Sequence, residues 1–266
     1  MRSDDRVALI GLGAIGKALI KGLQERRPGP TIGAVLHRRP VDAGVLPQLS
    51  HFTAIEDLLA WKPSVVIECA GHAAVQQHAA VLLENGIDVI IASIGVLGDA
   101  ATAERLEAAA RAGRSHLTAI SGAIGGIDAL RATKYAGLER VVYTGRKPPK
   151  AWMGTPAAER ANLLALKEEA VVYEGTARDA ARLFPKNANV TATVALAGIG
   201  FDRTSVRLIA DPKIAVNVHE LEIAGSFGRM HLKIENNPLP DNPSSSYLTA
   251  LSAEQALRSH FDHLRV

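Results

Sequence analysis

A glycine-rich turn between an apolar run and a helical segment, close to the N-terminus, constrains the fold of this chain most. Residues 6–10 suit a buried strand, and Gly11-Leu-Gly13-Ala-Ile-Gly16 follows directly and opens a helical segment that runs to about Arg26. Gly11 permits a tight turn, Gly13 lets the backbone approach a pyrophosphate, and Gly16 allows close packing of helix on strand. The pyrophosphate would lie at the positive end of the helix. The pattern predicts a dinucleotide site, although a bare glycine pattern can also be a plain connecting turn.

The segments behind this turn alternate between strand-like and helix-like patterns over residues 1–120. Residues 31–36 indicate a second strand, and 65–69 and 89–93 are continuous apolar runs rich in Val and Ile. Such runs are typical of strands covered on both faces of a parallel sheet. Residues 72–84 and 100–112 have helical patterns. This alternation predicts a doubly wound, Rossmann-type α/β domain.

The pattern changes after residue 120. Residues 204–211, 213–224 and 228–235 alternate polar and apolar side chains, which is typical of a half-buried antiparallel sheet. Residues 225–228, Gly-Ser-Phe-Gly, are the expected hairpin turn between the last two. We predict a second α+β domain over 121–237 with a mixed or antiparallel sheet. Residues 238–266, with a final helix over about 247–262, are expected to pack back on the first domain.

Composition excludes several classes of protein. The 266 residues are 47% hydrophobic and 21% charged, and the formal net charge is only +3, so neither disorder nor nucleic-acid binding is expected. No apolar run approaches the roughly 18 residues of a membrane span. The N-terminal residues lack a signal-peptide pattern, so we expect a cytoplasmic protein. The single cysteine, Cys69, can form neither an internal disulfide nor a usual zinc or iron–sulfur site, and no metal is expected.

The residues after the predicted strands define the expected cofactor site. The second strand ends in His37-Arg38-Arg39, with no acid for a ribose 2′-hydroxyl, and either arginine could pair with a 2′-phosphate or simply be exposed. We therefore predict that NADP is accepted alongside NAD. Ala70, Gly71 and Ser93 also follow strands and are placed to touch the cofactor. Cys69 is interpreted as a small buried hydrophobe rather than a nucleophile.

The second half contains a series of unusual segments in a particular order. They are 120–128 (ISGAIGGID), 145–152 (GRKPPKAW), 184–190 (FPKNANV), 217–220 (NVHE) and 237–246 (NPLPDNPSSS). Together with the N-terminal glycine motif, these segments resemble the L-aspartate dehydrogenase family along nearly the whole chain.

The resemblance implies a homodimer that oxidises L-aspartate to iminoaspartate with NAD or NADP. The imine then hydrolyses to oxaloacetate and ammonia, or feeds quinolinate and hence pyridine nucleotide biosynthesis. The family's catalytic histidine matches His219, and its contacts to the nicotinamide end of the cofactor match Ala123 and Asn189. The full expected cofactor-binding set is Gly11, Gly13, Ala14, Ile15, Gly16, Arg38, Ala70, Gly71, Ser93, Ala123 and Asn189.

The residues themselves leave some of these roles open. Period-two alternation puts Asn217 and His219 on one face with Ala215 and Leu221, which could line a polar cavity or hold a structural histidine. Asn189 could also be a helix N-cap. The glycines of 121–126 could admit the nicotinamide or form an interdomain hinge. The basic loop 146–150 could bind substrate carboxylates, but as a solvated loop it receives no assigned role.

Two other classes of function compete with this interpretation. One is a related two-domain reductase of homoserine or dihydrodipicolinate type, or a sugar oxidoreductase. The sugar enzymes typically carry Glu-Lys-Pro where this chain has Ser93-Ile94-Gly95. The other is a non-catalytic NAD(P)-binding regulator, which the fold alone does not exclude.

Overall fold

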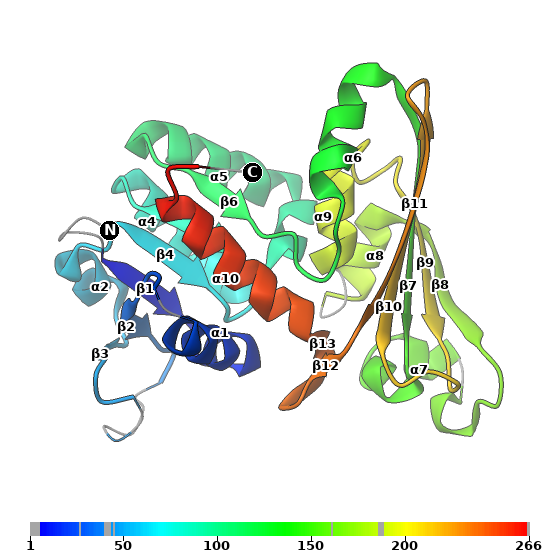
Figure 1. The fold of residues 1–266 in the computed structure, drawn as a ribbon, viewed down its shortest axis with the longest axis horizontal. Helices are drawn as coiled ribbons and strands as arrows, with labels where there is room; N and C mark the ends of the chain where they lie inside the picture. The colour runs from blue at the N-terminus through cyan, green and yellow to red at the C-terminus, as the bar shows by residue number, and fades with distance from the viewer. Residues whose placement is uncertain are drawn as a thin grey trace. The chain divides into compact units, whose positions relative to one another are not determined.

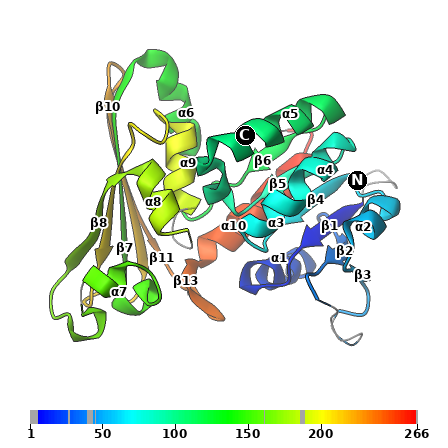
Figure 2. The same cartoon turned by 180° about the vertical axis from the view of Figure 1, so that it is seen from behind.

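A computed structural model describes residues 6–26, 28–39, 44, 46–160, 162–185 and 189–264. The chain divides into two compact units (Figures 1 and 2). The first is Met1–Ile120 with Thr249–Val266, and the second is Ser121–Leu248. The return to the first unit thus falls at Thr249 and not at residue 238. Residues 238–248 stay with the second unit because β12 and β13 pair there and Asn217 Nδ2 donates to Ser246 Oγ over 3.3 Å.

The first unit contains a six-stranded sheet in the order β3-β2-β1-β4-β5-β6. Every neighbouring pair is parallel, and the apolar residues of β1 and β4 are buried along their whole length. The predicted Rossmann-type parallel sheet is confirmed. Its strands are β1 (Val7–Ile10), β2 (Ile32–Leu36), β3 (Ser50–Phe52), β4 (Val65–Glu68), β5 (Asp88–Ile91) and β6 (Leu117–Ala119).

Helices cover both faces of this sheet. α1 and α10 lie on one face, and α4 and α5 lie on the other (Figures 1 and 2). The Glu254 carboxylate of α10 accepts from Arg26 Nε (3.1 Å) and Arg258 Nε (3.0 Å), which ties α10 to the end of α1. The helical elements are α1 (Ala14–Glu25), α2 (Ile55–Trp61), α3 (His72–Ala74), η1 (Val75–Ala79), α4 (Ala80–Glu84), η2 (Ile94–Gly98), α5 (Ala100–Gly113) and α10 (Tyr247–Phe261).

The second unit contains a five-stranded sheet in the order β11-β10-β7-β9-β8. β7 and β9 are parallel and the other pairs are antiparallel, so the sheet is mixed, as predicted. The expected hairpin is also present, with Gly225 paired to Gly228. The strands are β7 (Leu138–Lys147), β8 (Ala170–Thr176), β9 (Ser205–Ala210), β10 (Asn217–Gly225) and β11 (Gly228–Asn236), with the short pair β12 (Pro238–Leu239) and β13 (Asn242–Ser246).

Helices of the second unit cover one face of its five-stranded sheet. α6, α8 and α9 lie on the same face (Figures 1 and 2). The helical elements here are α6 (Ile127–Thr133), η3 (Lys134–Ala136), η4 (Pro149–Trp152), α7 (Ala157–Arg160), η5 (Leu163–Ala165), α8 (Ala177–Leu183) and α9 (Asn189–Ala197).

Considering the described part of the chain as a whole, we find no helix that is both long and apolar enough to cross a membrane.

The basic segment 146–150 is not the loop that the sequence suggested. Arg146 and Lys147 are the last two residues of β7, where Lys147 pairs with Ala210 of β9. Pro149 then begins the short helix η4. The strand extends through the basic residues because β7 is central and has a hydrogen-bonded neighbour on each side.

Candidate functional site

The glycine motif forms the turn between β1 and α1, and its glycines are required by their surroundings. Gly11 has a φ of 94°, and a Cβ at this position would lie 2.6 Å from the Cβ of Ala70. A Cβ on Gly16 would lie 2.4 Å from the carbonyl oxygen of Gly11. Gly13 is the residue before α1, so the amides of the first helical turn lie at the end of this motif.

A buried carboxylate joins the ends of β4 and β5. Glu68, which is 1% exposed, accepts hydrogen bonds at Oε1 from the amides of Ala70 (2.6 Å) and Gly71 (2.6 Å) and from Ser93 Oγ (2.8 Å). Its Oε2 accepts from the amide of Ser93 (3.1 Å). Burial raises the pKa of Glu68, and these hydrogen bonds oppose that shift. Glu68 therefore fixes the three residues expected to touch the cofactor on these two loops.

Cys69, Arg38 and His37 also follow strands of the parallel sheet. Burial raises the pKa of the Cys69 thiol, with a further contribution from Glu68, so a reactive thiolate is disfavoured. Arg38 is exposed just beyond β2. His37 before it is buried, and its Nε2 lies 2.8 Å from His51 Nδ1 in a stacked pair. Arg38 is thus at the surface on a strand end that carries no acid.

His219 lies near the start of β10, two residues after Asn217, and is 2% exposed. Its Nδ1 is hydrogen-bonded to Tyr143 Oη of β7 over 2.7 Å. Gly145 is opposite His219 in the register of the two strands, and a Cβ on Gly145 would lie 2.8 Å from Tyr143 Oη. The absence of a side chain at Gly145 therefore gives the tyrosine hydroxyl its place beside the imidazole.

The other ring nitrogen of His219 is buried without a partner. Considering only residues that the structure describes, Nε2 makes no hydrogen bond. Buried polar atoms in folded proteins nearly always have a partner, so this atom is suited to one that arrives with a ligand. Burial and then the charge of Lys147 lower the pKa of His219 to about 3, which keeps the imidazole neutral at physiological pH. Burial raises the pKa of Tyr143, which therefore remains a neutral phenol.

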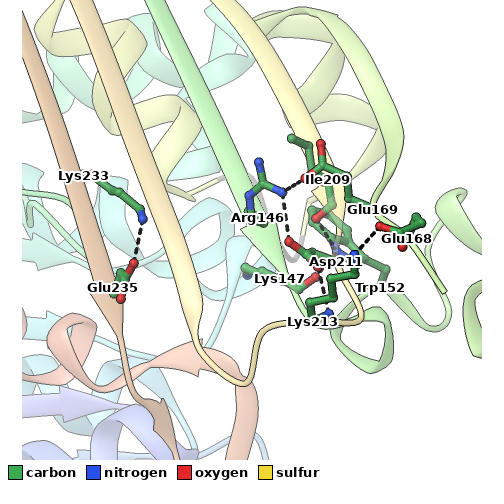
Figure 3. Close-up of polar contacts among 10 residues, drawn as sticks. All are labelled: Arg146, Lys147, Trp152, Glu168, Glu169, Ile209, Asp211, Lys213, Lys233 and Glu235. Carbon is green, nitrogen blue, oxygen red and sulfur yellow. Dashed lines mark hydrogen bonds and ion pairs between the residues drawn. The ribbon is translucent and has the colours of Figure 1, made fainter. Parts of the chain in front are cut away.

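Lys147 is a buried cation at the end of β7, and the sequence did not single it out. It is 7% exposed, and burial lowers its pKa to about 8. Its Nζ lies 5.9 Å from the centroid of the Trp152 ring. The Trp152 indole N–H in turn donates to the carbonyl oxygens of Lys147 (3.3 Å) and Ile209 (3.1 Å), as Figure 3 shows. Period-two alternation along β7, with a lysine at a buried position, was the signal that could have identified it.

Arg146, the neighbour of Lys147, has a different environment. Its Nη1 lies 3.0 Å from Asp211 Oδ2 and is also paired with Glu169 (Figure 3). Lys150 is exposed. Of the three cations in this segment, all of them described, only Lys147 is buried.

The loop that carries Ala123 is attached to the sheet of His219. Asn236 at the end of β11 donates from Nδ2 to the carbonyl oxygen of Ala123 over 2.9 Å. Asn189 is the first residue of α9, and its carbonyl accepts from Thr193 Oγ1 over 3.0 Å. Residues 186–188 of the segment before α9 lie outside the described part of the chain. Among the described residues, no group of His, Cys, Asp and Glu could hold a metal ion.

The candidate site residues thus form two groups, one in each unit. The glycine turn, Ala70, Gly71 and Ser93 meet at the carboxyl end of the parallel sheet, where ligands of doubly wound folds bind. In the second unit, strands β7 and β10 bring together an uncharged imidazole, a phenol and a buried ammonium group. The first group can bind phosphates, and the second can accept a proton close to a positive charge.

Comparisons with known proteins agree with this division. A family model for the aspartate dehydrogenase C-terminal domain matches residues 128–260, and one for the homoserine dehydrogenase NAD-binding domain matches residues 11–119. L-Aspartate dehydrogenases of Cupriavidus necator and Pseudomonas aeruginosa are 46% and 44% identical to this chain, over 96% of it and 97% of each relative.

Solved structures have the same architecture. The crystal structure of aspartate dehydrogenase from Thermotoga maritima has a TM-score of 0.78 at 28% identity and covers 98% of this chain and 99% of that one. A hyperthermophilic archaeal homoserine dehydrogenase in complex with NADPH, at 11% identity over 98% of this chain and 99% of its own, shares only the fold, with a TM-score of 0.62. From its sequence relatives and the family model of its second unit, this chain belongs to the L-aspartate dehydrogenase family.

Proposed function

We propose that this chain oxidises L-aspartate at Cα with NAD or NADP as hydride acceptor, and so forms iminoaspartate, which water converts to oxaloacetate and ammonia. As a member of its family the chain is an NAD(P)-dependent oxidoreductase. The single observation that carries the proposal is the buried Nε2 of His219, which has no hydrogen-bond partner among the described residues. The opposite ring nitrogen, Nδ1, is hydrogen-bonded to Tyr143 Oη.

The residues of the first unit fit a dinucleotide. A Cβ on Gly13 would come no closer than 3.8 Å to another group, the carbonyl oxygen of Cys69, and one on Gly71 would meet nothing within 4 Å. The backbone at both glycines is therefore open to a close approach. We assign the pyrophosphate to the glycine turn and first turn of α1, with Ala70, Gly71 and Ser93 beside it, and the nicotinamide end to Ala123 and Asn189. When bound, the cofactor supplies the hydride acceptor.

His219 is the proposed proton acceptor. L-Aspartate carries an α-ammonium, and its nitrogen lone pair must be free before it can form the C=N bond as hydride leaves Cα. Nε2 of His219 can take that proton provided that Nδ1–H donates to Tyr143 Oη. A neutral phenol can accept this bond both before and after the transfer. Once the proton has passed to solvent, the same nitrogen can accept one from the water that attacks the imine.

The hydrogen bond between Tyr143 and His219 should be measurable in catalysis. Tyr143→Phe leaves Nδ1 without a partner, and we expect kcat to fall about 10-fold or more, in line with 1–3 kcal/mol for an unsatisfied buried group. Gly145→Ala should reproduce this loss, because the new methyl group would displace the Tyr143 hydroxyl.

Gly175→Ala is the matched control for Gly145→Ala. Its Cβ would crowd the hydroxyl of Tyr173 in the same i, i+2 arrangement on β8, away from His219. Steady-state turnover of the Tyr143, Gly145 and Gly175 variants separates a local effect at the imidazole from general damage to the sheet. Equal losses in both glycine variants would contradict the positioning role of Tyr143.

Arg38 should contribute to the use of NADP. Arg38→Asp replaces a possible 2′-phosphate partner by an acid that suits a ribose 2′-hydroxyl. We expect KM for NADP to rise about 10-fold or more, as for the loss of one charge-assisted hydrogen bond, while KM for NAD stays level or falls. Arg39→Asp, at the next exposed position, is the matched comparison. An unchanged ratio of the two KM values in both variants would remove the arginines from cofactor selection.

A spectrophotometric assay tests the proposed function directly. Purified protein with oxaloacetate, ammonia and NADPH or NADH should consume the reduced cofactor, and L-aspartate with the oxidised cofactor should produce it. L-Homoserine in place of L-aspartate tests the related class of dehydrogenase. Cofactor binding without turnover of either substrate would indicate a regulator and reject the proposal.

We also propose an oligomeric state, a cellular location and a metabolic role. We assign catalysis and dimerisation to the second unit, where alternate residues of β11 are exposed and give its sheet a surface that a second copy could cover. Light scattering of the purified protein measures whether it is a monomer or a dimer. A cytoplasmic location suits the substrate and the cofactor, and iminoaspartate would connect the reaction to pyridine nucleotide biosynthesis.

A further inference from the structure

We propose that Lys147 binds a carboxylate of the substrate beside His219. The inference rests on the proposed function, since it names the residue of the second unit that recognises the negative charge of L-aspartate. L-Aspartate carries two carboxylates, and a site for it needs at least one cation on the same surface as the proton acceptor.

The register of the sheet places Lys147 on the face of His219. Alternate residues of a strand share a face, so Tyr143, Gly145 and Lys147 of β7 lie on one side. Gly145 is opposite His219, and Tyr143 is hydrogen-bonded to it. Lys147 is therefore the next residue along the same surface, and its charge is close enough to lower the pKa of His219.

The other cations near the end of β7 are less buried than Lys147. Arg146 is paired with Asp211 and Glu169, and Lys213 is paired with Glu168 (Figure 3). Lys150 is at the surface. Lys147 differs from them in being buried on the face of the imidazole, with its ammonium near the Trp152 ring and its main chain held by the Trp152 indole.

The electrostatics of the pair suit an anionic ligand. Burial lowers the pKa of Lys147, and burial together with Lys147 lowers that of His219, so both groups gain from a nearby negative charge. A bound carboxylate would stabilise the ammonium form of Lys147 and raise the pKa of His219. The substrate would thereby make its own proton acceptor more basic, which a neutral ligand of similar size would not do.

Lys147→Met tests this assignment because methionine is an unbranched side chain of nearly the same length and carries no charge. We expect KM for L-aspartate to rise about 10- to 100-fold, as for the loss of a charge-assisted hydrogen bond, while the Kd of NADPH stays within about twofold. The inhibition constant of succinate, a dicarboxylate without the amine, should rise by a similar factor. Lys150→Met, in the same segment but exposed, should change none of these values.

The thermal midpoint at pH 7 should not fall in Lys147→Met, because a buried charge is replaced by an apolar group, and this separates the effect from misfolding. Unchanged KM for L-aspartate and unchanged succinate inhibition in a folded Lys147→Met protein would overturn the inference and leave the proposed function intact. A wild-type protein that does not oxidise L-aspartate would overturn the proposed function. Titration of its NADPH complex with succinate would then still show whether Lys147 binds carboxylates.

Discussion

His219→Gln should lower kcat for L-aspartate oxidation by about 10²- to 10⁴-fold, the usual contribution of a well-placed acid–base group. Glutamine retains polar atoms at this position, but its amide cannot take a proton from the substrate ammonium. His219 is buried, and its Nδ1 is hydrogen-bonded to Tyr143 Oη. Tyr143 remains a neutral phenol and does not replace Nε2 as the proton acceptor. The Kd of NADPH should change little, because the glycine turn and Arg38 belong to the other unit.

His231→Gln is the matched control for this variant. His231 lies on β11 in the same sheet but is exposed, and it pairs in register with Glu222 rather than with the strand residues beside Tyr143. Its turnover should stay near that of the wild type. Turnover close to normal in His219→Gln, with cofactor binding intact, would show that proton transfer takes place elsewhere. A loss of both turnover and NADPH affinity would indicate a folding defect, which the urea unfolding midpoint would reveal.

The fold was predictable because its signals are local. The glycine turn lies between a buried strand and a helix, as its spacing requires, and the apolar runs at 65–69 and 89–93 became the interior strands β4 and β5. Period-two alternation and two glycines defined the hairpin at 225–228. In each case the information lies within a few consecutive residues, where backbone sterics and burial on one or both faces decide the structure.

Residues that act through contacts far along the chain were harder to predict. Tyr143 meets His219 across 76 positions, which neither strand shows by itself. Lys147 was expected in a solvated basic loop, because two prolines follow it. In the structure β7 continues through Lys147, since Arg146 pairs with β10 and Lys147 pairs with β9. Glu68 was hidden at the end of an apolar run, although a carboxylate in such a place signals hydrogen-bond partners. A polar residue at a buried position of an apolar strand therefore indicates a candidate site residue.

Glu68 gives the second large effect, which concerns stability and cofactor binding together. Glu68→Ala removes the acceptor of three amides and one hydroxyl, of which the amide and the hydroxyl of Ser93 are buried. We expect the free energy of unfolding to fall by about 3–5 kcal/mol, since each buried donor left unsatisfied costs about 1–3 kcal/mol. The Kd of NADPH should rise about 10-fold or more, because the loops with Ala70, Gly71 and Ser93 lose the carboxylate to which both are hydrogen-bonded. Urea unfolding and a fluorescence titration with NADPH measure the two effects.

Glu68→Gln separates the role of the carboxylate from that of the side-chain volume. Its amide oxygen can still accept at the position of Oε1, but its NH₂ group would face the amide of Ser93, where Oε2 now accepts. The loss should therefore be smaller, about 1–2 kcal/mol for one broken bond and its unsatisfied donor. Glu84→Gln, at an exposed position of α4, should change neither stability nor NADPH affinity. If Glu68→Gln and Glu68→Ala both matched the wild type, the two loops would owe their conformation to the backbone alone. A graded loss would instead establish that one buried carboxylate couples the stability of the parallel sheet to the shape of its cofactor edge.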